Sequence, residues 1–538
     1  MRLLFGDRWM EGFLDPHREP GEYRVRVVAW RTLERLDALY FVRPRSLRMV
    51  ANYLREIGPR EVWRKIASRS GERLRNDKYL SAGLGRVLEG PVGGLPPGTA
   101  VAFLAPAHPA CAERVVLAPG LVAEVSEDAL RGLPSEGVLH AERPGAGVPE
   151  GVRGWSPHSG APLPEGAGRA AAELALELAR DPAGARTLEG APSPVATSRP
   201  GRASAEAGTR AVLFGYGNYA KTLVIPNVRP WLEIERIHEL DPTQIPAGAG
   251  ETAWDTSPRW PQGAAGEGFR AAFLAGYHHT HAPLAAEAMD RGAAAVVEKP
   301  IATDAAQLAE LLPRLERGGR LFSCYQKRYH PFNEAALGDL GVRPGDPVAY
   351  HCMVYEVPLP ELHWYRWPNS RSRLVSNGCH WIDHFLHLNG YAEPARAEVA
   401  AAADGTLNAS VELENGAFFT MVLTDAGSAR IGVQDYVELR AGGTTVRIAN
   451  ATTYEAEGPD RVLRRLRVNK MVAYRRMYAD IARRVVEGAP GDSARSVRVS
   501  AGLVLEMERR LHAALDAREA PLRPGAAPAE DTLTTVRS

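Results

Sequence analysis

The sequence predicts an α/β protein: a doubly wound parallel sheet, then an α+β domain with an open antiparallel sheet, preceded by a small β-barrel-like domain. From 209 to 332, short apolar runs alternate with helical patterns, which is typical of parallel strands joined by helical crossovers. From 333 to 517, strand-like runs come first, and two helices follow at about 471–487 and 496–517. That order is typical of an α+β domain.

The chain has 538 residues, too many for one hydrophobic core, so several domains are expected. Short strands broken by Gly and Pro predict the barrel-like domain over 1–140, with an amphipathic helical stretch at about 46–68. A Gly-, Pro- and Ala-rich stretch at 141–208 is predicted to be a linker with one helix at 170–180. Residues 518–538 are predicted to be a disordered tail.

Composition excludes several classes of protein. The net charge is +1, with 65 basic and 64 acidic residues, and this balance favours neither nucleic acid nor an anionic membrane as partner. Four scattered cysteines without metal-ligand spacing are typical of a reducing compartment. No stretch approaches the roughly 20 apolar residues of a membrane-spanning helix. We therefore expect a cytoplasmic protein.

A glycine-rich turn follows the first strand of the predicted parallel sheet. It has the pattern G-x-G-x-x-A and consists of Gly215, Tyr216, Gly217, Asn218, Tyr219 and Ala220. Gly215 permits a tight bend, Gly217 allows the backbone to approach a pyrophosphate, and a helix then begins, as in a Rossmann dinucleotide site. Asp241 lies 24 residues beyond Gly217, where an acid can accept hydrogen bonds from ribose hydroxyls. This favours NAD, with NADP as the alternative; a turn that binds nothing is the structural alternative.

Residues 276–281 follow the later strand at 271–275 and reach the carboxyl edge of the sheet, where open α/β sheets bind ligands. Gly276, Tyr277 and His281 are therefore candidate cofactor contacts. The segment holds three histidines in four residues, but consecutive residues that enter a helix point in different directions. We therefore predict no metal.

A lysine ends the next apolar strand, 294–297. Pro300 stops the strand, so Lys299 is expected to point into the cleft, where its charge can polarise a carbinol or carbonyl oxygen. Glu298 precedes it as a candidate cofactor contact. A surface lysine at a strand end is the alternative.

A histidine and an aspartate stand three residues apart in the second domain. His380 and Asp383 can share one face of a helix, and histidine suits a general base because its pKa lies near neutrality. A structural His–Asp pair is the alternative.

These segments resemble the Gfo/Idh/MocA family, the glucose–fructose oxidoreductases and inositol dehydrogenases. The resemblance covers about 209–515 and rests on GYGNYA, LAGYHHTHAPLAAEAMDRG, VVEKPIATD, CYQKRYHPF and NGCHWIDHFLHLNG. It implies NAD(P)-dependent hydride transfer on sugars, polyols or related small molecules. By analogy it also implies a homo-oligomer formed through the open sheet.

The resemblance also implies site residues. It places the catalytic lysine on Lys299 and the histidine on His380, with Asp383 beside it. Further candidates for cofactor and substrate contacts are Gln326, Arg328, His363, Trp364 and Asn377. Many members carry an aspartate four residues before the histidine, but this chain has Ser376 there, so Asn377 or a residue such as His363 would orient His380 instead.

The N-terminal part resembles, more weakly, the GroES-like barrel of medium-chain alcohol dehydrogenases, through KYLSAGLGRVLEGPVGG and the segment after it. No Cys/His/Glu zinc set is visible there, which predicts a degenerate barrel without an active site of its own.

The leading hypothesis is an NAD(P)-dependent dehydrogenase or reductase acting on CH–OH groups. Two alternatives stay open. One is a redox-neutral lyase, epimerase or glycosidase with tightly bound NAD. The other is a nucleotide-binding sensor or scaffold that lacks chemistry.

Overall fold

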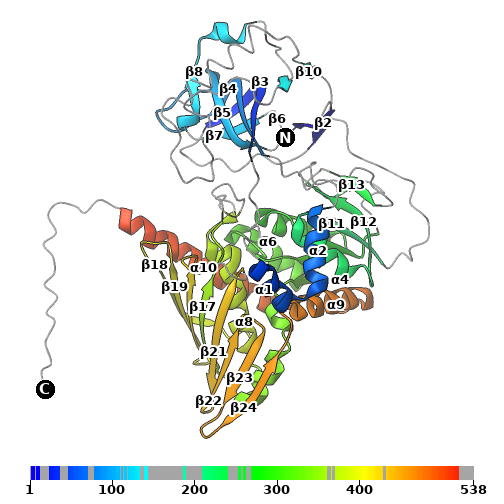
Figure 1. Ribbon diagram of the computed structural model, residues 1–538, viewed down its shortest axis with the longest axis vertical. Coiled ribbons are helices and arrows are strands. Elements are labelled where there is room, and N and C mark those ends of the chain that lie inside the picture. The colour runs from blue at the N-terminus through cyan, green and yellow to red at the C-terminus, as the bar shows by residue number, and fades with distance from the viewer. Residues whose placement is uncertain are drawn as a thin grey trace, which may run out of the picture.

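A computed structural model gives the fold (Figure 1). It describes residues 2–5, 8–11, 23–36, 47–70, 78–108, 111–112, 114–117, 119–131, 133, 138–142, 186–188, 209–239, 252–255, 259–261, 268–359, 365, 370–427 and 432–519. The predicted helix at 170–180 and the predicted tail beyond residue 519 lie outside the described residues.

A six-stranded, entirely parallel sheet confirms the predicted doubly wound fold. Its strand order is β13-β12-β11-β14-β15-β16. The strands are β11 (Arg210–Phe214), β12 (Glu233–His238), β13 (Ala253–Asp255), β14 (Ala271–Leu274), β15 (Ala294–Val297) and β16 (Leu321–Ser323). Phe214 lies beside His238 on one side and beside Leu274 on the other, so the central strands end at one edge.

Helices cover both faces of this sheet. One face packs against η3 (Ala220–Val224), α4 (Ile225–Val228) and α9 (Val472–Glu487), in a single apolar cluster. The other face packs against α5 (His281–Asp290) and α6 (Ala305–Glu316), in a cluster that continues into the second domain. The core of the parallel-sheet domain is thus completed by α9, which follows the second domain in the sequence.

The second domain is built on an eight-stranded sheet in the order β18-β19-β20-β17-β21-β22-β23-β24. Its strands are β17 (Ala349–Tyr355), β18 (Pro394–Ala401), β19 (Leu407–Leu413), β20 (Phe418–Thr424), β21 (Gln434–Ala441), β22 (Thr444–Ala449), β23 (Thr453–Glu457) and β24 (Val462–Arg467). The predicted antiparallel arrangement holds except between β17 and β20, which run parallel. Strand β17, the first of this sheet in the sequence, lies in its middle, between β20 and β21.

One face of this sheet is covered and the other is open. Side chains alternate between buried and exposed along β19 and β20, as expected for a sheet with one packed face. The covered face packs against α7 (Phe332–Leu340), η10 (Leu374–Gly378), α8 (Cys379–Leu388) and α10 (Ala494–Glu519). Within the residues described, no helix has the length and apolar character needed to cross a membrane.

The N-terminal region forms a separate seven-stranded sheet (Figure 1). Its strands are β3 (Tyr23–Leu36), β4 (Lys78–Glu89), β5 (Ala100–His108), β7 (Arg114–Leu117), β8 (Val122–Glu124), β9 (Val138–Glu142) and β10 (Arg186–Leu188). A small sheet joins β1 (Arg2–Phe5), β2 (Arg8–Glu11) and β6 (Cys111–Ala112). The region also contains two short 3-10 turns, η1 (Pro119–Leu121) and η2 (Glu127–Leu130). Strand β10 lies inside the predicted linker and pairs with β9, so that segment returns to the N-terminal sheet.

The amphipathic stretch predicted at 46–68 forms two helices, α1 (Leu47–Ile57) and α2 (Pro59–Ser70). They lie beside α4 and α9 rather than with the strands on either side of them in the sequence (Figure 1).

Candidate active site

The glycine-rich turn lies between β11 and the helical residues 218–228, at the carboxyl edge of the parallel sheet. Gly215 has φ of +94°, and a Cβ atom there would lie 2.5 Å from the carbonyl oxygen of Ala275. Only glycine tolerates both conditions. A Cβ atom on Gly217 would meet nothing within 4 Å. The turn therefore has the tight bend and the open backbone approach that a pyrophosphate needs.

Among the described residues, an acid that lies against this turn is Glu239. Strand β12 ends at His238, and Glu239 follows directly. The backbone N–H of Tyr216 donates a hydrogen bond to Glu239 Oε2 at a distance of 2.5 Å. Asp241 lies outside the described residues. Glu239 therefore stands at the end of the second strand, and the predicted ribose contact of Asp241 stays a prediction.

Lys299 extends from the end of β15 into the space between the two domains. Its ammonium group donates to the Ser376 carbonyl oxygen at 2.6 Å and to the Tyr365 hydroxyl at 3.2 Å, and it lies 5.1 Å from the centre of that ring. Burial acts to lower the pKa of Lys299, but Tyr365 and Cys379 raise it, and the net direction is upward. Lys299 is thus held as a cation by neutral oxygens.

Glu298 points away from the cleft, into the packed face under α9. Its carboxyl group accepts a hydrogen bond from the Tyr478 hydroxyl, and the Tyr478 and Tyr219 hydroxyls are 3.1 Å apart. Burial raises the pKa of Glu298 to about 7, although the Tyr478 hydrogen bond and the charge of Lys299 act to lower it. Glu298, which we predicted to contact the cofactor, instead links the lysine strand and α9 to the glycine-rich turn.

The histidine-rich segment forms the short turn η6 (His278–Thr280) before α5. His281 bridges two loops: its Nδ1 is 2.8 Å from the Pro300 carbonyl oxygen, and its Nε2 is 3.3 Å from that of Gly276. Burial lowers its pKa to about 4, so the ring is neutral and donates to only one of these carbonyls. His281 therefore holds the loops rather than a ligand.

His278 is the histidine of this segment that faces the cleft. It is 2% exposed, and its ring lies 4.7 Å from that of Tyr365, the residue bound to Lys299. The candidate cofactor contacts Gly276 and Tyr277 form the backbone of the turn, and the Thr280 hydroxyl donates to the Tyr277 carbonyl at 2.7 Å.

His380 lies in the first turn of α8, close enough to Lys299 for the charge of that lysine to act on it. The side chain is almost fully buried, and its Nδ1 has no hydrogen-bond partner among the protein atoms. Burial, with the positive charges of Lys299 and Lys327, lowers the pKa of His380 well below its usual value. The ring is therefore neutral near pH 7 and can accept a proton.

Asp383 and Arg328, which we predicted to face the substrate, face each other. Arg328 donates to both carboxylate oxygens of Asp383, at 2.8 and 2.5 Å, and to Asp492 at 2.9 Å. The Ser500 hydroxyl donates to Asp383 at 2.7 Å, and the Asp383 side chain is fully buried. The structure therefore does not support the predicted catalytic role of Asp383.

A second buried ion pair lies on the other side of His380. Lys327 Nζ is 2.5 Å from Asp435 Oδ2, and the Trp381 indole N–H donates to the same oxygen at 3.0 Å. The sequence offered little sign of this pair, because its partners are 108 residues apart. The one sign of this pair in the sequence is that Lys327 follows the candidate contact Gln326.

Other candidates are placed as follows. Asn377 donates to Glu356 Oε1 at 2.6 Å, so its side chain is engaged within the second domain. Gln326 is buried, and its Oε1 has no hydrogen-bond partner. His363 and Trp364 lie outside the described residues.

No protein-family model and no curated protein matches the chain. Solved structures do match. One is a dehydrogenase from Clostridium difficile, 13% identical, covering 56% of this chain and 99% of its own, with a TM-score of 0.45. Another is a UDP-N-acetylglucosamine 3-dehydrogenase from Acidithiobacillus ferrooxidans, 18% identical, covering 57% and 98%, with a TM-score of 0.46.

A third match is a 3-ketoreductase from Actinomadura kijaniata, solved with NADP and TDP-benzene. It is 16% identical to this chain and covers 57% of this chain and 97% of its own, with a TM-score of 0.47. The activity proposed below rests on this chain's own residues.

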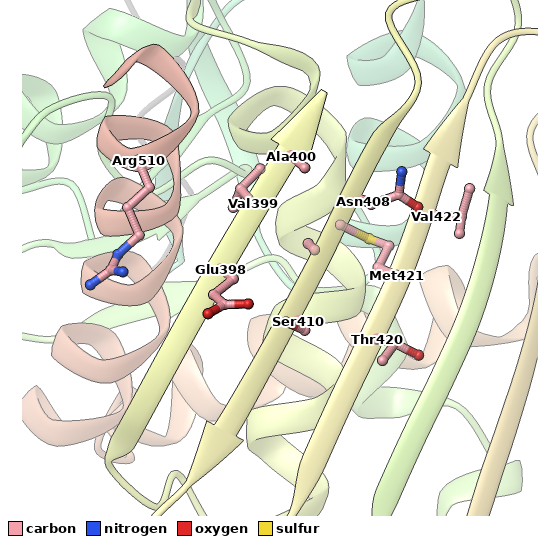
Figure 2. A pocket seen from close by; sticks show the side chains of 10 residues that line it. Glu398, Val399, Ala400, Asn408, Ser410, Thr420, Met421, Val422 and Arg510 are labelled. Carbon is pink, nitrogen blue, oxygen red and sulfur yellow. The ribbon is translucent and has the colours of Figure 1, made fainter. Parts of the chain in front are cut away.

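A hollow of about 560 Å³ lies elsewhere, on the open face of the eight-stranded sheet (Figure 2). Its lining includes Glu398, Ser410, Thr420 and Arg510, from β18, β19, β20 and α10. The sheet separates it from α8 and His380. Within the described part of the chain, no three His, Cys, Asp or Glu side chains are arranged to hold a metal ion.

Proposed function

We propose that the chain is an NAD(P)-dependent oxidoreductase that interconverts a carbinol and a carbonyl group on a sugar, polyol or related small molecule. One observation carries this proposal. A turn shaped for a pyrophosphate and a lysine held only by neutral oxygens lie at the same carboxyl edge of one parallel sheet. That edge is where open α/β sheets bind ligands.

The coenzyme-binding residues fit a dinucleotide. The bend at Gly215 and the open side of Gly217 leave the backbone accessible to a pyrophosphate, next to the start of the helix at 218. Glu239 would accept a ribose hydroxyl, because a carboxylate has more acceptor positions than the one that Tyr216 N–H takes. This acid favours NAD over NADP.

The residues across the cleft supply the rest of the reaction. A nicotinamide dinucleotide held at this turn would supply the hydride acceptor for oxidation and the hydride donor for reduction. Lys299 would donate to the substrate oxygen and stabilise negative charge that develops there. In oxidation, His380 Nδ1 would take the hydroxyl proton as the hydride leaves the same carbon. Arg328 and Asp383 would act only by holding α8 in position.

The first test is the cofactor of the freshly purified protein. Absorbance and mass spectra of the small molecules released by heat would show whether NAD(H) or NADP(H) is bound, and fluorescence titration would give affinities for both. Micromolar binding with turnover on a panel of sugars and polyols supports the proposal. Stoichiometric NAD without net NADH formation favours the redox-neutral alternative, and binding without any turnover favours the scaffold.

A homo-oligomer stays a prediction. Light scattering of the wild type and of a Tyr436→Lys variant checks it, because Tyr436 is 55% exposed on the open face of the sheet.

A further inference from the structure

The hairpin of α1 and α2 comes from the N-terminal region but packs against the coenzyme-binding unit. The two helices meet at Gly58, which has φ of +86°. Helix α2 packs against η3, the helical turn directly after the glycine-rich turn. Ile57, at the tip of the hairpin, is 5% exposed, whereas Trp63 on the outer side of α2 is 69% exposed.

The tip of the hairpin touches the segment that leads into α9. The Lys470 backbone N–H donates to the Glu56 carbonyl oxygen at 3.3 Å. A Cβ atom on Gly58 would lie 3.2 Å from the side-chain nitrogen of Asn469, so the two chains approach closely there. These contacts join residues more than 400 positions apart.

One ion pair fixes the hairpin to α9. Arg475 Nη1 donates to Glu61 Oε1 at 2.9 Å, and Arg64 of the hairpin itself lies 3.3 Å from the other oxygen. Glu61 is 4% exposed, whereas the Arg475 side chain is 37% exposed. The carboxylate is thus sequestered, but water reaches the arginine, and such a pair can open and close at moderate cost.

The same end of α9 borders the proposed catalytic groups. Tyr474 is close enough to Lys299 and Glu298 for their charges to act on its pKa, which burial raises to about 12. On the next turn, Tyr478 holds Glu298. The hairpin therefore spans from the coenzyme turn, through η3, to the helix that flanks Lys299.

We propose that the α1–α2 hairpin covers the coenzyme side of the cleft, with Glu61–Arg475 as its latch, so that coenzyme enters and leaves when the latch opens. This rests on the proposed function, because the ligand concerned is a nicotinamide dinucleotide. It gives the N-terminal region a part in coenzyme exchange.

Stopped-flow fluorescence of NADH with the full-length chain tests this, and needs no substrate. Arg475→Glu places two carboxylates together and should raise the association and dissociation rates of NADH about tenfold each, with a smaller change in Kd. The double variant Glu61→Arg/Arg475→Glu restores the attraction and should return both rates towards the wild type. Arg498→Glu is the matched control, because it breaks an exposed pair with Glu393 and should change neither rate.

Each result decides the question. If NADH dissociates faster from Arg475→Glu but does not associate faster, the hairpin is a fixed support for η3, and the proposal that it opens to admit coenzyme is wrong. Unchanged rates in a chain that binds NADH would also overturn it, with the proposed function intact. A chain that binds neither NADH nor NADPH would overturn the proposed function and this inference together. Where Arg475→Glu does not fold, Arg475→Ala carries the same comparison.

Discussion

Two cations between the domains, Lys299 and Arg328, are held in opposite ways. Arg328 is 7% exposed and donates to two carboxylates, Asp383 and Asp492. Lys299 donates to a carbonyl and a phenol, and no carboxylate of the described residues lies within ion-pair distance of it. The charge of Arg328 is used within the protein, whereas that of Lys299 is available to a substrate oxygen. A buried cation is therefore a candidate catalyst only when its charge is not already neutralised.

Arg328→Met should give the largest effect, because it leaves the buried Asp383 and the partly buried Asp492 without their cation. We expect a loss of about 3–5 kcal/mol in the free energy of unfolding, measured by denaturant titration. Arg498→Met removes the cation of an exposed pair and should lose less than about 1 kcal/mol. Similar losses of unfolding free energy in the two variants would show that Arg328 is no more important for stability than a cation of an exposed pair.

Glu298→Gln extends the comparison to an acid whose carboxyl group is held by a tyrosine hydroxyl. Burial raises the pKa of Glu298 to about 7 in the folded protein, above its usual value near 4.5. The folded state therefore binds the proton more tightly, and the stability from this group is complete below about pH 4.5 and lost as pH rises through 7. The loss is on the order of 3 kcal/mol. Between pH 4.5 and 8, the free energy of unfolding of the wild type should fall relative to that of Glu298→Gln. If denaturant titrations give parallel curves of this free energy against pH, the pKa of Glu298 is not raised.

Lys299→Met should leave folding intact and reduce turnover. We expect kcat to fall at least ~10²-fold on any substrate that the panel yields, with NADH affinity nearly unchanged. Steady-state kinetics, with the unfolding transition as the control for folding, measure this. Full turnover in the variant would remove Lys299 from the proposed site.

Glu239→Gln should give the smallest effect, on coenzyme choice. Loss of the charged acceptor should weaken NADH binding about tenfold and leave NADPH binding less affected. Glu235→Gln is the matched control, because Glu235 lies on β12, the strand that Glu239 follows, but pairs with Arg210. Equal changes in the two variants would place the ribose elsewhere.

The strands around the coenzyme turn were predictable because they are continuous apolar runs with clear ends. Strand β15 is Ala294–Val297, as predicted, and α9 and α10 begin within two residues of their predicted starts. The sequence does not predict strand β24, because the residues on both of its faces are mostly polar or exposed. It is held to β23 by pairs such as Arg465–Glu455, which hydrophobic periodicity does not reveal.

The position of a candidate residue is predictable where the local sequence aims its side chain. Gly215 and Lys299 follow strand ends and His380 lies in the first turn of α8, and their roles stay predictions. The ion pair of Asp383 was not predictable, because its partner, Arg328, lies 55 residues away and is reached only through the tertiary fold. The contact of Glu239 with the turn was not predictable either, because the end of β12 depends on its pairing with β11.

Helix α9 has a consequence for synthesis of the chain. It supplies Met477, Tyr478, Ile481, Ala482 and Val485 to the core of the parallel sheet, whose own strands end at residue 323. During synthesis, that apolar face stays uncovered while about 150 further residues are added, because its covering helix is made only after them. A fragment cut at the end of the sixth strand would present this bare face to other chains, and would aggregate rather than fold as a separate coenzyme module.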